Sequence, residues 1–176
     1  MNIQKLIYDA KSAYLNSDYD FAIRKFEEIV QQVPNCEECY FYLGLCYEKI
    51  GYEIKAIEYY KKGLVLCDNE KYISDYYLNI GKNLLMISQL NEALFSFDKA
   101  SMYQENYLVS LYNKSLVYMC QKNYKQALET LNYVVDNGLV NKRIKQNLEY
   151  CANRQNTLGT GQFLLHNAKN DFGVPK

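Results

Sequence analysis

The chain has 176 residues, and its 20 Lys and Arg residues balance 20 Asp and Glu residues. This balance argues against binding to nucleic acid or to an anionic membrane, because both need concentrated basic charge. Only 2 prolines and 8 glycines are present, which disfavours a turn-rich β protein and leaves a helical domain with a sizeable core as the expectation.

Residues 1–15 carry charges throughout and contain no apolar run, so they lack the pattern of a secretory signal. The longest apolar segment, residues 84–90, is far shorter than the roughly 20 residues of a membrane-spanning helix. We therefore expect a cytoplasmic location, where the 6 cysteines would be reduced thiols.

Four helical hairpins are predicted in succession, over residues of about 3–36, 37–70, 74–107 and 108–141. The first helix of each hairpin carries a small residue: Ala10, Gly44, Gly81 and Ser115. Twelve residues later each hairpin has an alanine: Ala22, Ala56, Ala93 and Ala127. Four residues further on comes a bulky side chain: Phe26, Tyr60, Phe97 and Leu131. The alanines are 34, 37 and 34 residues apart, so three residues are inserted once, near 71–73.

The small and bulky positions are explained by the packing of two helices against each other. The small residues let two antiparallel helices approach closely, and the bulky residues fill the space beside them. One such hairpin cannot bury its apolar face alone, whereas stacked neighbours bury a continuous core.

The small–alanine–bulky framework over residues 3–141 resembles the tetratricopeptide repeat (TPR) family. The resemblance implies an all-α fold, a right-handed superhelix of antiparallel helix pairs forming an α-solenoid of four repeats. Of the prolines that often close a repeat in this family, only Pro34 is present. Asp9 and Lys114 occupy places where the family prefers apolar residues.

The C-terminal part of the chain divides into two segments. Residues 141–154 predict a polar helix with one apolar side formed by Ile144, Leu148 and Cys151, similar to the solvating helix that commonly ends such arrays. The repeats and this helix make one TPR domain, 1–154. Residues 155–176 contain 3 of the glycines and are predicted to be a flexible tail; the alternative is that residues 162–165 dock on a neighbouring surface.

In TPR proteins the first helix of each pair lines the concave surface, so its outward side chains form a groove. The residues predicted to bind a partner are Tyr8, Phe41, Tyr42, Asn79, Lys82, Tyr112, Asn113, Leu116 and Asn147. Three of the asparagines are spaced by 34 residues and could form a ladder that holds the backbone of an extended peptide, since an amide both donates and accepts. The alternative is that this spacing is an accident of an asparagine-rich composition.

The sequence gives little support for a metal, redox or catalytic site. Cys36 and Cys39 have the spacing of a zinc site, but no second pair completes the four ligands that zinc needs; a redox pair at a helix start is a further alternative. No catalytic constellation or phosphate-binding loop is present, so we expect no enzymatic activity, cofactor or metal. The basic clamp with which some TPR proteins hold a C-terminal carboxylate is also missing. Its places are taken by Ile7, Lys11, Tyr42, Asp75 and Asn79, of which only Lys11 is a cation, and Asp75 would repel a carboxylate.

The predicted function is that of a non-enzymatic adaptor that binds an extended protein segment in the concave groove. The first alternative is a small chaperone resembling the TPR chaperones of bacterial secretion systems. The second is a scaffold that self-associates through its tail or end helix, and the oligomeric state stays open.

Overall fold

The computed structural model describes residues 3–155. The predicted tail falls on residues 155–176 and, except for Gln155, lies outside the described part. The helices of that part are α1 (Ile3–Leu15), α2 (Tyr19–Gln32), α3 (Glu37–Lys49), α4 (Glu53–Leu66), α5 (Glu70–Met86), α6 (Leu90–Ala100), α7 (Tyr107–Cys120), α8 (Tyr124–Asp136) and α9 (Lys142–Gln155), with a 3-10 turn η1 (Gln104–Asn106) before α7.

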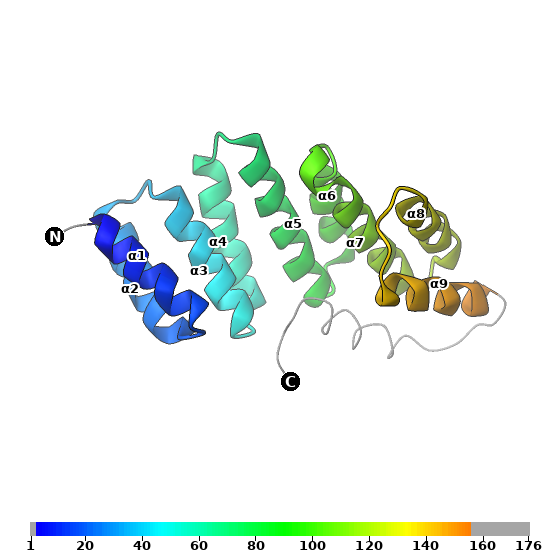
Figure 1. Cartoon of the computed structure of the whole chain (residues 1–176), viewed down its shortest axis with the longest axis horizontal. Coiled ribbons are helices and arrows are strands. Elements are labelled where there is room, and N and C mark those ends of the chain that lie inside the picture. Colours follow the sequence, from blue (N-terminus) through cyan, green and yellow to red (C-terminus); the bar gives the residue numbers. More distant parts are fainter. Residues whose placement is uncertain (1–2, 156–176) are drawn as a thin grey trace.

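The helices pack in consecutive antiparallel pairs that stand side by side in a curved row (Figure 1). Each pair also packs against the next pair, and α9 covers the last pair through α8. This arrangement is an α-solenoid, so the predicted fold class is confirmed. No described helix is long and apolar enough to cross a membrane.

The turn inside each hairpin repeats the same backbone geometry. Each contains one residue with positive φ: Ser17, Gly51, Ser88 and Lys122, at φ values of 63°, 80°, 62° and 60°. These residues follow the 34, 37 and 34 spacing of the alanines. Asp18 and Asn123 then cap α2 and α8, since their side chains accept from the backbone N–H groups of Phe21 and Gln126.

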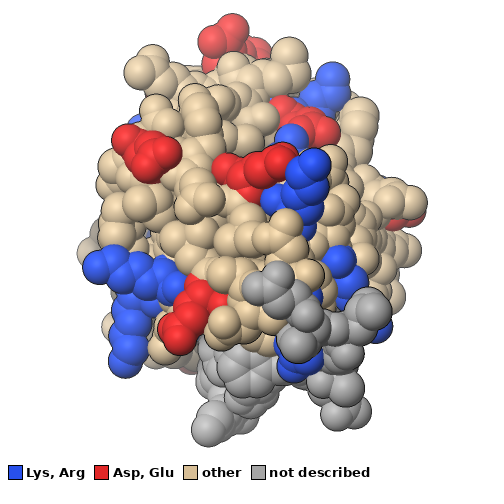
Figure 2. Space-filling view, turned by 90° about the vertical axis from the view of Figure 1, so that its right-hand side faces the viewer, with Lys and Arg blue, Asp and Glu red and all other residues tan. Residues whose placement is uncertain are grey.

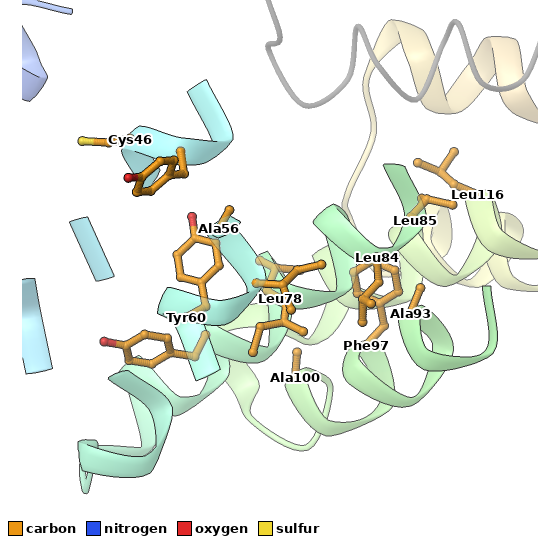
Figure 3. Packing of buried hydrophobic residues seen from close by; sticks show 14 of the residues in the cluster. Cys46, Ala56, Tyr60, Leu78, Leu84, Leu85, Ala93, Phe97, Ala100 and Leu116 are labelled. Atoms are coloured by element: carbon orange, nitrogen blue, oxygen red, sulfur yellow. The ribbon is translucent and has the colours of Figure 1, made fainter. Parts of the chain in front are cut away.

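Close helix contact depends on the small residues, as the sequence predicts. A Cβ atom added to Gly44 would collide with the Tyr60 ring, and one added to Gly81 would lie 2.6 Å from Cε1 of Phe97. Phe97 is fully buried in the same cluster as Ala93 (Figure 3). The small and bulky positions are therefore two halves of one packing contact between the paired helices.

The three inserted residues lengthen one helix. α5 has 17 residues, whereas α1 and α3 have 13 each, and residues 71–73 lie in its first turn. The insertion therefore extends α5 towards its N-terminus and adds Tyr72 to its surface. Asn69 caps this extended helix, because its side chain accepts from the N–H of Lys71 at 3.1 Å.

The expectation that all 6 cysteines are reduced is wrong for one pair, because Cys36 and Cys39 form a disulfide. The start of α3 brings their Cα atoms to 5.4 Å, inside the range that a disulfide requires. Cys46, Cys67, Cys120 and Cys151 are free. No cluster of potential metal ligands forms among the described residues.

Acidic and basic side chains are interspersed among neutral ones on the face at the α8–α9 end (Figure 2). This view contains no extended patch of one sign on the described part of the surface, in keeping with the balanced charge of the chain.

Candidate functional site

The first helices of the pairs lie next to one another along one side of the solenoid: α1 contacts α3, and α5 contacts α7. A pocket of about 320 Å³ opens between α3 and α5. Its lining consists of three carboxylates and three aromatic rings, from Glu37, Glu38, Phe41, Tyr42, Tyr72 and Asp75. This α3–α5 pocket is the candidate site.

Two of the aromatic rings that line the pocket, Phe41 and Tyr42, pack against other aromatic rings. The Phe41 ring meets the Tyr76 ring edge-on, with centroids 5.0 Å apart. The Tyr42 ring stacks on Phe26 at 5.3 Å and meets Tyr14 edge-on at 5.5 Å. Such contacts fix ring orientation, so Phe41 and Tyr42 offer a preorganised apolar wall.

Two of the three carboxylates, Glu38 and Asp75, have partners of different kinds. Glu38 forms an ion pair with Lys11 of α1. Asp75 accepts a hydrogen bond of 2.7 Å from the Asn106 amide, which is buried and also donates to Ser74. Asp75 is therefore held in position by a neutral partner, and no described residue forms an ion pair with it.

The ammonium of Lys11 contacts two of the pocket residues, Glu38 and Tyr42. It lies 5.3 Å from the centroid of the Tyr42 ring while it pairs with Glu38. A cation placed between an aromatic face and a carboxylate is thus already part of this surface.

The structure divides the predicted binding residues into two groups. Phe41 and Tyr42 line the pocket; Tyr8 is 72% exposed on α1, and Lys82 and Tyr112 are half-buried on α5 and α7. The buried members are Asn79, Asn113, Leu116 and Asn147.

The expectation that the three asparagines point into an open groove is wrong. Asn79, Asn113 and Asn147 are only 8%, 3% and 5% exposed. The amide of Asn113 donates to the carbonyl of Val109 at 2.8 Å, and that of Asn147 to the Tyr112 hydroxyl at 3.3 Å. Neighbouring first helices pack closely enough to cover this row, although the Oδ1 atom of Asn113 has no hydrogen-bond partner.

Four pocket residues are missing from the set that the sequence predicts to bind a partner: Glu37, Glu38, Tyr72 and Asp75. Tyr72 belongs to the three inserted residues, so the repeat pattern assigns it no place. The insertion itself is the signal that could have pointed to it, because an extra turn at the start of a groove helix must add surface there.

Burial raises the thiol pKa of all four free cysteines, which disfavours the thiolate form. Burial raises the pKa values of the Cys46 and Cys151 thiols to about 12, so both stay protonated at neutral pH. The thiolate is the reactive form of cysteine, and these two side chains serve the core.

The repeated hairpins, their periodic turns and the lined inner face define a TPR fold. No family model matches the chain. Its solved structural neighbours include MamA from Desulfovibrio magneticus RS-1, with a TM-score of 0.79 and 17% identity over 98% of this chain and 94% of that chain. They also include YrrB, described as a TPR protein with an unusual peptide-binding site, with a TM-score of 0.71 and 15% identity over 96% of this chain and 84% of that chain.

A curated protein from Guillardia theta is also similar in sequence. It is described as an uncharacterized protein, ycf37, and is 25% identical over 145 residues, which make up 79% of this chain and 82% of that protein. These similarities establish the fold and leave the partner to be inferred from the site.

Proposed function

We propose that the protein is a non-enzymatic adaptor that binds an extended segment of a partner protein along its first helices. The α3–α5 pocket carries this proposal, because an indentation with three aromatic rings is the kind of surface that supplies binding energy at interfaces. The peptide-binding site named for YrrB supports it by analogy of fold.

In this proposal the exposed and half-buried members of the predicted set contact the partner: Tyr8, Phe41, Tyr42, Lys82 and Tyr112. Asn113 is buried together with the rest of the asparagine row, so this proposal assigns it no direct contact with the peptide. Asn79, Asn147 and Leu116 support the groove from below.

The proposal is tested with a phage-displayed library of random peptides selected on the full chain. Peptides that are enriched are then titrated against wild type and Tyr72→Ala, which removes an exposed ring from the pocket. The matched control is Phe95→Ala, which removes an exposed ring from α6 outside the pocket.

We expect Tyr72→Ala to weaken binding about tenfold, since aromatic side chains are frequent hot spots worth more than about 1 kcal/mol, and Phe95→Ala to leave it unchanged. Failure to enrich any peptide, or equal losses in both variants, would contradict the proposal.

We also propose a cytoplasmic location. The structure contains the Cys36–Cys39 disulfide, whereas disulfides are rare in the cytosol, so the redox state of this pair in the cell tests the location. Alkylation of free thiols in intact cells, followed by mass spectrometry, measures the state of the pair. A fully oxidised pair would argue for a different compartment.

A further inference from the structure

We propose that the α3–α5 pocket is selective for a cationic side chain of the bound segment, and for arginine in particular. This inference rests on the proposed function, since it names the residue type that the same groove selects.

The first argument is charge. Three of the six lining residues are carboxylates, and none is a Lys or Arg. Lys11 pairs with Glu38, whereas the described residues supply no ion pair to Glu37 or Asp75. A neutral or anionic side chain would leave these two carboxylates without a counter-charge, and a cation entering the pocket would compensate them.

The second argument is the aromatic lining. Phe41, Tyr42 and Tyr72 surround the carboxylates, and the face of an aromatic ring attracts a cation electrostatically. Lys11 already uses this chemistry intramolecularly, with its ammonium over Tyr42 and against Glu38. The partner's cation would repeat the arrangement within the pocket, beside Phe41, Tyr72 and Asp75.

The third argument is shape. The volume of about 320 Å³ lies at the lower end of the range for ligand pockets, about 300–1,000 Å³, which suits one long side chain. Its methylene stem would lie along the apolar rings while its charged head reaches the carboxylates. Arginine fits better than lysine, because its planar guanidinium stacks on rings and donates to carboxylates in a fixed fork.

The test uses the selected peptides and the full chain. Sequencing of the enriched pool measures whether one position is occupied by Arg or Lys. A peptide from the pool is then synthesised with Arg and with citrulline, a neutral side chain of nearly the same shape. We expect the citrulline peptide to bind about tenfold or more weakly, the usual scale for a lost charge-assisted hydrogen bond.

Two variants assign the effect to the pocket. Glu37→Gln and Asp75→Asn remove charge and keep shape, and the new Asn can still accept from Asn106. Each should reduce the Arg-over-citrulline preference several-fold. Glu129→Gln, on the exposed surface of α8, is the matched control and should leave the preference unchanged. Thermal unfolding of each variant verifies that it is folded.

The outcomes separate the two proposals. Peptides enriched without a basic position, or an Arg preference that Glu37→Gln and Asp75→Asn leave intact, would overturn the selectivity while peptide binding stands. Absence of any enriched peptide would overturn the adaptor proposal and the selectivity with it.

Discussion

The ring of Phe97 lies against the Cα of Gly81, so close that a single methyl group on Gly81 would come within 2.6 Å of it. Gly81→Ala is therefore expected to destabilise the protein by about 1–3 kcal/mol, although alanine has the better helix propensity by about 1 kcal/mol. Urea denaturation followed by circular dichroism measures this change. Phe97→Leu removes the aromatic ring, so Gly81→Ala should lower the free energy of unfolding less in this background than in wild type. Equal losses of stability in both backgrounds would contradict the contact.

Ala93 is completely buried where α6 meets α5. Ala93→Leu would force extra atoms into a filled interface, and we expect a loss of about 1–3 kcal/mol in the free energy of unfolding or a failure to fold. The control is Ala152→Leu on the exposed face of α9, where the change should be within about 0.5 kcal/mol. A fully stable Ala93→Leu protein would show that the assigned register is wrong.

A buried polar network joins the second and third helix pairs. The amide of Asn83 donates to Oε2 of Glu48 at 2.8 Å, and the Tyr60 hydroxyl donates to the same atom at 3.0 Å. Asn83→Ala would remove one of the two donors and leave a cavity, which should cost about 1–3 kcal/mol. Asn132→Ala, exposed on α8, serves as the control; similar denaturation midpoints for the two variants would mean that the network adds no stability.

Alkaline pH should destabilise the fold. Burial raises the pKa of Tyr14 and of Tyr59 from the ordinary value of 10 to about 12, and that of Cys46 from 9 to about 12. Between the unfolded and folded pKa values the folded state binds more protons than the unfolded state, so the free energy of unfolding falls as pH rises. This contribution is complete below pH 9 and is lost progressively up to about pH 12.

Urea midpoints measured from pH 8 to 11.5 examine this effect. Tyr14→Phe removes one of the titrating groups and should make the decline shallower. A midpoint that stays constant up to pH 11.5 would contradict the assigned pKa shifts.

The sequence alone predicts the helix pairs, because the small, alanine and bulky positions are close neighbours along the chain and repeat at one spacing. It also finds two of the six pocket residues, Phe41 and Tyr42. It misses Tyr72, which lies in the insertion, and the contact of Gly63 with the Tyr76 ring, which joins two different repeats.

The asparagine row shows that sequence spacing predicts the position of a residue but not its burial. Spacing places Asn79, Asn113 and Asn147 at equivalent positions in successive first helices, and in this respect the sequence is informative. How closely neighbouring first helices approach depends on every side chain between them, so spacing cannot tell an open row from one that is 3–8% exposed.

In the described part of the solenoid, helix pairs pack mainly against their nearest neighbours, and this affects how stable the pocket is. Each helix pair is held mainly by the pairs on either side of it, so the array behaves as a one-dimensional chain of coupled units. Order in such a chain is lost first at its ends, where a unit has one neighbour instead of two. The pocket lies at the junction of α3 and α5, in the interior of the array, and would stay formed while the terminal helices fray and close again.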